Sequence, residues 1–135
     1  MSASFHYDVD AARNLVRLTM SGFFHRQDIL AMTAARAEAY RQLNCAPNAH
    51  VTLIDVRGLK IQSQETMDAF GAMLGVREFR SRRLALVLAQ TLARTQVERV
   101  LASRPGVTGF SDPAAALAWL LDDEADQAPR LRAVG

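Results

Sequence analysis

Polar residues suited to chemistry follow the apolar run VTLIDV, which begins at residue 51 and is typical of a strand covered on both faces. Asp55 lies at the end of this run, just before Val56, Arg57 comes two residues after Asp55, and Ser63 and Gln64 begin the next segment. Open α/β sheets usually bind ligands at the carboxyl ends of their strands. We therefore expect candidate ligand-binding residues at this edge, namely Asp55, Arg57, Ser63 and Gln64.

A second polar group follows the next apolar run, residues 84–89. A helix that begins here offers free backbone amides, and the guanidinium of Arg94 adds positive charge, as in sites for small anions or headgroups. Gln90, Thr91 and Arg94 complete the set of candidate ligand-binding residues.

Several of these candidates also have a structural explanation. Ser63 precedes a helical pattern and can cap its first turn, as Thr91 can for the next helix. The carboxylate of Asp55 can accept hydrogen bonds from a turn at 57–59 or from Arg57 itself, and Arg94 can be solvated. These roles account for the residues without any ligand.

Catalytic and metal-binding patterns do not occur in the sequence. His6, His25 and His50 lack metal-ligand spacing and are expected on the surface, and Cys45 has no activating base beside it. The glycine-rich and nucleophile-elbow motifs of common enzymes are missing as well. We therefore expect no enzymatic activity, no cofactor and no bound metal.

Composition favours one globular, cytoplasmic domain. The chain has 135 residues, half of them hydrophobic, a formal net charge of +2 and a single cysteine. No segment resembles a signal peptide or is long enough to span a membrane. A basic run is expected to form a solvated loop that could meet an acidic partner or a phospholipid surface, and nucleic acid is not expected as a partner. This run contains Arg77, Arg80, Arg82 and Arg83.

Hydrophobic periodicity predicts an α/β fold. A β-hairpin at 4–9 and 15–20 is followed by alternating helices and strands, which favours a mixed, mainly parallel five-stranded sheet with about four helices. Further strands are expected at 51–56, 84–89 and 107–110, and helices at 27–43, 63–79, 91–103 and from 113 onward. The inward stripe of the first helix is Ile29, Met32, Ala35, Tyr40 and Leu43. We expect a single domain over residues 1–121 and a charged, flexible tail over 122–135.

Three segments, LIDVRG, RRLALVLAQTLARTQVERV and VTGFSDPAAALAWLL, resemble the SpoIIAA-like family of STAS-type domains. The resemblance implies a hairpin-led α/β sandwich, which is also similar to CRAL-TRIO lipid-binding domains. Its most specific parts are Asp55 at the strand end and the closing pattern of Phe110, Asp112, Ala116, Leu117, Trp119 and Leu120.

Anti-sigma factor antagonists of this type carry Asp-Ser-Ser-Gly after the corresponding strand, and a partner kinase phosphorylates the second serine. Alignment on Asp55 and Gly58 places Ser63 at the aspartate, Gln64 at the first serine and Glu65 at the phosphorylated serine. The phosphorylation switch is therefore not expected in this chain, and Ser63 is interpreted as a helix cap.

The leading hypothesis is a non-catalytic, regulatory STAS-like module that binds a partner protein or a small apolar or anionic ligand, with a homodimer as a further expectation. A first alternative is a lipid carrier of CRAL-TRIO character, with an apolar cavity under the second helix. Met67, Phe70, Met73 and Leu74 would line that cavity. A second alternative is a small hydrolase or transferase that uses Asp55 with Thr91 or Ser63.

Overall fold

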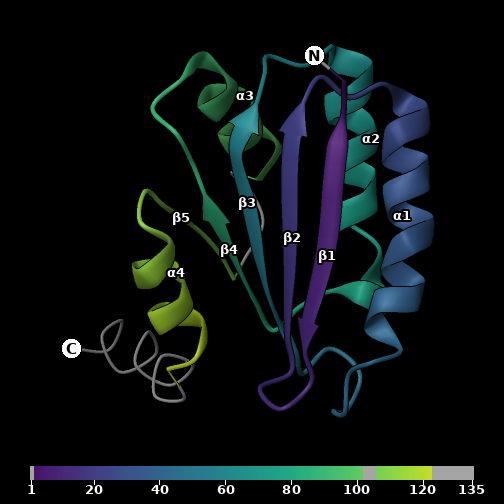
Figure 1. Ribbon diagram of the computed structural model, residues 1–135, viewed down its shortest axis with the longest axis vertical. Helices are drawn as coiled ribbons and strands as arrows, with labels where there is room; N and C mark the ends of the chain where they lie inside the picture. The colour runs from purple at the N-terminus through teal and green to yellow at the C-terminus, as the bar shows by residue number, and fades with distance from the viewer. Residues whose placement is uncertain (1, 102–105, 123–135) are drawn as a thin grey trace.

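The computed structural model describes residues 2–101 and 106–122. Its five strands form one sheet in which they lie side by side in sequence order (Figure 1). The first two strands are antiparallel, and each later strand is parallel to the one before it. The strands are β1 (Ser4–Asp10), β2 (Leu15–Gly22), β3 (Val51–Leu59), β4 (Arg83–Val87) and β5 (Val107–Phe110). The prediction of an N-terminal hairpin and a mixed, mainly parallel sheet is confirmed.

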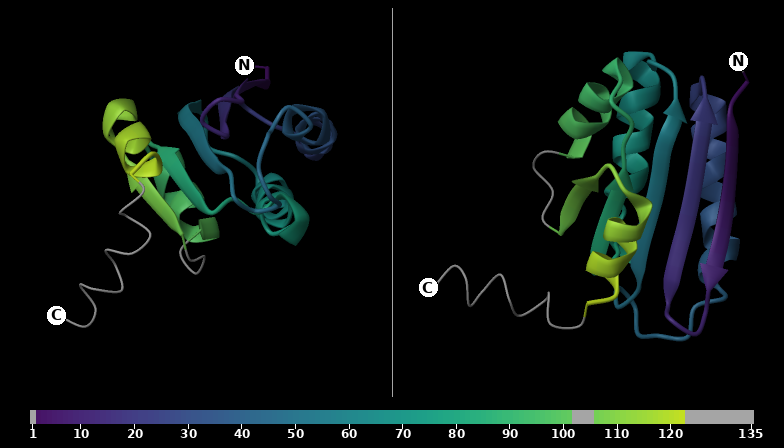
Figure 2. Two further views of the ribbon diagram at one scale, coloured as in Figure 1. Left: turned by 90° about the horizontal axis from the view of Figure 1, so that it is seen from below. Right: turned by 60° about the vertical axis from the view of Figure 1, so that its left-hand side comes forward.

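Three helices cover one face of this sheet and a fourth covers part of the other (Figure 1, Figure 2). Right-handed crossovers that always advance in the same direction across a sheet place their helices on the same face. The crossover helices are α1 (Arg26–Tyr40), α2 (Gln64–Leu74) and α3 (Leu92–Leu101). The fourth helix, α4 (Pro113–Leu120), packs against β3, β4 and β5. Among the described elements, none covers that face of β1 and β2.

The sheet divides the apolar residues into two cores. The larger core lies between the sheet and α1 to α3, and the smaller one lies under α4. Neighbouring β3 residues point in opposite directions, so that Ile54 enters the larger core and Leu53 the smaller one. This burial on both faces explains why the sequence of β3 begins with a nearly continuous run of apolar residues.

The helices end earlier than the sequence predicts. α1 ends at Tyr40 rather than at residue 43. α2 ends at Leu74 with Gly75 as its C-cap, and a separate 3-10 turn, η1 (Arg77–Phe79), follows where one continuous helix was expected. The helix end predicted near 103–106 and the tail predicted at 122–135 fall almost entirely outside the described residues.

β3 is longer than predicted and does not end at Asp55. It continues to Leu59 because it keeps pairing with β2, with Gly58 opposite Ser21 beyond an irregularity in the register. A Cβ atom at Gly58 would lie 2.7 Å from the Cβ of Ser21, so this close pairing needs glycine. The turn expected at 57–59 is therefore a strand.

The prediction that the basic run is a solvated loop is wrong for Arg83. Its side chain, in β4, is 4% exposed, and it donates hydrogen bonds to the carbonyls of Trp119 (2.6 Å) and Asp122 (2.9 Å). A cation suits the C-terminal end of a helix, because the last carbonyls have no partners within the helix. Arg83 therefore fastens the end of α4 to the sheet, whereas Arg77, Arg80 and Arg82 are exposed as expected.

The three histidines also differ in their exposure to solvent. His6 is exposed on β1, and the exposed His25 is the N-cap of α1, where its side chain and that of Asp28 form a capping box. His50 is instead 3% exposed, and its ring lies edge-on to Tyr40 with the centroids 4.7 Å apart. The prediction of surface histidines is wrong for His50, because it directly precedes β3 and faces the layer of helices.

Ser63 caps α2, as the sequence predicts. Its Oγ accepts a hydrogen bond from the backbone amide of Thr66 at 3.1 Å and donates to the Thr66 hydroxyl, which in turn donates to the Phe24 carbonyl. The cap therefore joins the start of α2 to the segment between β2 and α1.

Replacement of this cap is expected to destabilise the fold. Ser63→Ala leaves the Thr66 amide without its acceptor and should lower the free energy of unfolding by about 1 kcal/mol. Ser63→Asp keeps an acceptor and adds a favourable charge at the N-terminus of α2, so it should unfold at the same denaturant concentration as the natural protein or a higher one. Urea titration followed by circular dichroism measures both. Equal stability of the alanine and aspartate variants would contradict the capping role.

Candidate functional site

Asp55 and Arg57 form an ion pair on the α4 side of the sheet. Oδ2 of Asp55 lies 2.7 Å from Nη2 of Arg57, and Oδ1 accepts hydrogen bonds from Nε and from the backbone amide of Arg57. The hydrogen bond from the Arg57 side chain lowers the pKa of Asp55, while burial of the carboxylate opposes that shift. The sequence predicted that Asp55 could accept hydrogen bonds from Arg57, and these contacts confirm it.

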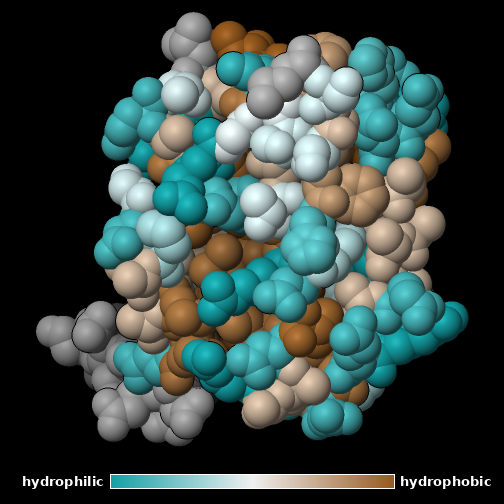
Figure 3. All heavy atoms as spheres, in the orientation of Figure 1, coloured by the Kyte–Doolittle hydropathy of each residue, from teal (hydrophilic) through white to brown (hydrophobic). Residues whose placement is uncertain are grey.

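The ion pair borders a shallow groove of ≈ 330 Å³ between α4 and the uncovered part of the sheet. Leu53 and Leu117 contribute apolar surface to it, and Arg17 and Thr19 lie on its β2 side. Figure 3 shows this face hollowed beside α4, with hydrophobic atoms at the bottom and hydrophilic atoms around them. Asp55 and Arg57 therefore belong to an open surface that combines polar and apolar side chains.

Ser63 and Gln64 lie at the head of α2, on the opposite face of the sheet from this groove. Besides the cap made by Ser63, Nε2 of Gln64 donates to Oδ1 of Asp68 one helical turn later, at 2.8 Å. The structure thus separates the two residues from Asp55 and Arg57, although all four are close in sequence.

The candidates after β4 have local contacts. Gln90 and Thr91 are exposed, and Nε of Arg94 pairs with Oε1 of Glu98 one turn along α3. The Thr91 carbonyl accepts from the Arg94 backbone amide at 3.1 Å. Nη1 of Arg94 is buried without a hydrogen-bond partner in the described part of the chain, so an anion site here stays a prediction.

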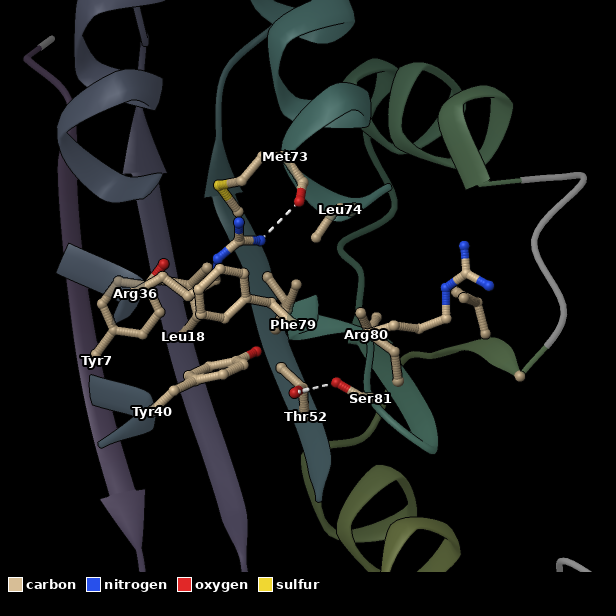
Figure 4. A pocket seen from close by; sticks show the side chains of 14 residues that line it. Tyr7, Leu18, Arg36, Tyr40, Thr52, Met73, Leu74, Phe79, Arg80 and Ser81 are labelled. Atoms are coloured by element: carbon tan, nitrogen blue, oxygen red, sulfur yellow. Dashed lines mark hydrogen bonds between the residues drawn. The ribbon is translucent and has the colours of Figure 1, made fainter. Parts of the chain in front are cut away.

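A pocket that the sequence did not indicate lies at the other end of the sheet, between the helices and the amino-terminal ends of β3, β4 and β5 (Figure 4). Its volume is ≈ 60 Å³. Polar side chains from several elements line one part of it, and apolar side chains line the rest. The polar set is Tyr7, Arg36, Tyr40, Thr52, Arg80 and Ser81, and the apolar set is Leu18, Ile54, Met73, Leu74, Phe79, Leu84 and Val107.

Arg36 is the charged group at the centre of this pocket. It is 5% exposed, its Nη1 donates to the Met73 carbonyl at 2.6 Å, and its Cζ lies 4.2 Å from the centroid of the Phe79 ring. Its Nε is buried with no hydrogen-bond partner among the described residues. Burial lowers the pKa of Arg36, and nearby Tyr40 and Tyr7 oppose that shift.

The tyrosines that flank Arg36 carry neutral hydroxyl groups. The hydroxyl of Tyr7 donates to the Met32 carbonyl at 2.9 Å. Burial raises the pKa of both Tyr7 and Tyr40, so both hydroxyls stay protonated near neutral pH. Below them, the hydroxyls of Thr52 and Ser81 share a hydrogen bond. The polar part of the pocket therefore combines two arginines, Arg36 and Arg80, with neutral hydroxyl groups.

One sequence signal could have found Arg36. The inward stripe predicted for α1 includes Ile29 and Met32, and a helix places the residue four positions after Met32 on the same face. The buried residues of α1 are Ile29, Met32, Arg36 and Ala39. Arginine is mostly found on protein surfaces, so the residue type argued against burial of Arg36 although its spacing indicated burial.

A second concave surface lies between α1 and α2. This α1–α2 groove measures ≈ 670 Å³, and its walls are mainly apolar. Leu30 is 57% exposed and Val76 36% exposed, although both are large hydrophobic residues. The residues that line the groove are Arg26, Ile29, Leu30, Thr33, Glu65, Asp68, Ala69, Ala72, Met73 and Val76.

The described residues contain neither a metal-ligand cluster nor a membrane-spanning helix. No cluster of three or more histidine, cysteine or acidic side chains there could hold a metal ion. None of the helices in residues 2–101 and 106–122 is long and apolar enough to cross a membrane.

Comparisons with known proteins identify the fold. No protein-family model matches the chain, and no curated protein matches its sequence. Among solved structures, an anti-sigma factor antagonist from Mycobacterium paratuberculosis superposes with a TM-score of 0.62 at 12% identity, over 90% of this chain and 96% of the other. An uncharacterised protein of the DUF3478 family from Shewanella loihica, described as having a SpoIIAA-like fold, superposes with a TM-score of 0.64 at 20% identity, over 87% of this chain and 93% of the other. The chain therefore has the SpoIIAA-like fold.

Proposed function

We propose that this protein is a non-catalytic regulatory module of the SpoIIAA-like, STAS-type family, and that it acts by binding a partner protein through the α1–α2 groove. The fold that it shares with an anti-sigma factor antagonist supports a regulatory role. The observation that carries the proposal is the pair of exposed hydrophobic side chains, Leu30 and Val76, in an apolar groove. Such patches on a soluble domain often mark protein-binding surfaces.

The shape and charge of the groove favour a helical segment of the partner. Small residues, Ala69 and Ala72, line the α2 side and allow another backbone to approach closely. Glu65 and Asp68 give this side an acidic border, while Arg26 lies on α1. An amphipathic helix with basic residues beside its apolar stripe would complement these features, as in other helix-in-groove complexes.

The lipid-carrier alternative receives less support. The space bordered by Met67 and Phe70 is only ≈ 10 Å³, and these side chains are 4% and 1% exposed. The other two residues expected to line a lipid cavity, Met73 and Leu74, border the ≈ 60 Å³ pocket around Arg36. Neither space holds a lipid chain, since ligand pockets usually measure about 300–1,000 Å³.

The hydrolase or transferase alternative is disfavoured where it pairs Asp55 with Ser63, and its pairing of Asp55 with Thr91 stays a prediction. Asp55 is paired with Arg57 on the α4 side of the sheet, whereas the hydroxyl of Ser63 is engaged with Thr66 at the head of α2 on the other side. A nucleophile and its base must lie within hydrogen-bond reach of each other. Action in the cytoplasm and a homodimer remain predictions.

A charge placed in the α1–α2 groove should prevent partner binding. Leu30→Glu puts a carboxylate into the apolar wall, and we expect at least about a tenfold loss of affinity, as for a buried interface anchor. Ile61→Glu is the matched control, because Ile61 is similarly exposed at 52% but does not line the groove.

The partner is first isolated by affinity capture with the natural protein, and its binding to purified variants is then measured by calorimetry. Equal affinity of the Leu30 variant and the natural protein, or a loss confined to the Ile61 variant, would contradict the proposed surface. Native mass spectrometry of the same samples reports the number of subunits and tests the homodimer.

The pH dependence of stability tests whether Asp55 has a structural role. Its pKa is lowered in the folded protein, so the ion pair stabilises the fold above the ordinary pKa of an aspartate, about 3.9, and this contribution is lost as the pH falls through the lowered value. The pair is partly exposed, so the contribution should be about 1 kcal/mol or less.

Asp55→Asn should therefore lower stability at pH 7 and reduce the loss of stability on acidification to below pH 4, measured by urea unfolding at each pH. Arg57→Gln should give the same reduced acid sensitivity. Parallel pH profiles for the natural protein and both variants would argue against the structural role and reopen a chemical one.

A further inference from the structure

The pocket around Arg36 holds a buried positive charge that no carboxylate among its described lining residues balances. Arg36 is 95% buried, and none of the residues that line the pocket is acidic. Its contacts are a backbone carbonyl and the Phe79 ring, which are neutral groups. A buried charge normally requires an ionic partner, because these contacts replace only part of its lost hydration.

The guanidinium also keeps a donor for which residues 2–101 and 106–122 supply no acceptor. Nη1 is engaged by the Met73 carbonyl, but Nε is buried and unpaired among the described residues. Figure 4 shows the guanidinium group of Arg36 inside the pocket, between Tyr7, Phe79 and Met73. An acceptor brought by a ligand would complete its hydrogen bonds.

The remaining lining defines the chemistry of that acceptor. Tyr40, Thr52 and Ser81 are polar, and the hydroxyls of Thr52 and Ser81 share a hydrogen bond, whereas Leu74, Leu84 and Val107 are apolar. A volume of ≈ 60 Å³ corresponds to only a few water molecules, since each needs about 10–15 Å³ by this measure. The space therefore suits a small ligand with one anionic end and a short apolar part.

A carboxylate fits these conditions because its oxygens only accept hydrogen bonds and pair well with a guanidinium. We propose that the pocket around Arg36 binds a small organic acid, whose carboxylate pairs with Arg36 while its short hydrocarbon part packs against Leu74, Leu84 and Val107. Exposed Arg80, which also lines the pocket, adds positive charge that attracts the anion.

Nuclear magnetic resonance can observe the unpaired donor directly. Sodium butanoate is titrated into the natural protein at constant ionic strength, with butanamide and sodium chloride as matched controls. We expect saturable shifts at the Arg36 Nε–H resonance and at the amides of Met73 and Leu74, with butanoate alone. An absence of saturable shifts, or equal shifts with butanamide or chloride, would overturn the proposal.

Variants provide a second measurement. Arg36→Met removes the charge but keeps an apolar side chain of similar length, so it should weaken butanoate binding by at least about tenfold without lowering the unfolding temperature. A lower unfolding temperature with unchanged binding would mean that Arg36 only holds α1 to α2.

Val107→Phe tests the pocket without touching Arg36. The larger ring should occupy the space and abolish the butanoate shifts, whereas Thr108→Phe, one residue along β5 and on its other side, should leave them intact. Full butanoate binding by the Val107 variant would count against this site. The partner protein is not involved in any of these measurements. Their outcome therefore does not depend on whether the α1–α2 groove binds a partner.

Discussion

The handedness of the parallel crossovers is the constraint on which the rest of this structure depends. Each strand from β3 to β5 is added beside its predecessor in the same direction, so right-handed connections place α1, α2 and α3 on a single face. Of the described elements, α4 alone lies on the other face, held partly by the buried contacts of Arg83 with the end of that helix. One face of the domain is therefore a thick layer of helices, and the other is half open.

This asymmetry gives the two faces different uses. The open face carries the Asp55–Arg57 pair in a shallow groove, where each of these two side chains balances the charge of the other. The covered face has depth, so it can enclose an apolar core and, at the amino-terminal ends of the strands, a small pocket. The unbalanced charge of Arg36 lies in that deeper layer, where a missing partner is more costly than at the surface.

The pocket and the α1–α2 groove meet at Met73. This residue lines both, its carbonyl accepts from Arg36, and α2 ends one residue later. The end of α2 is also where the sequence predicted continuous helix and the structure has a C-cap and a 3-10 turn. Phe79 belongs to the 3-10 turn that follows this break. The centroid of its ring lies 4.2 Å from Cζ of Arg36.

The sequence by itself determined the order and type of the elements, the hairpin, the two-sided burial of β3, and the cap of α2 at Ser63. These features depend on periodicity and on contacts between near neighbours, which a single sequence records. It also paired Asp55 with Arg57, two residues apart.

Only the tertiary structure decided the rest. Continued pairing with β2 extended β3 past Asp55, and the sheet separated Asp55 from Ser63 although both lie within one short stretch of chain. Arg36, His50 and Arg83 are buried by elements distant in sequence, against the usual preference of their residue types. A charged side chain is buried when tertiary contacts or a ligand compensate it, and neither can be read from the neighbouring residues.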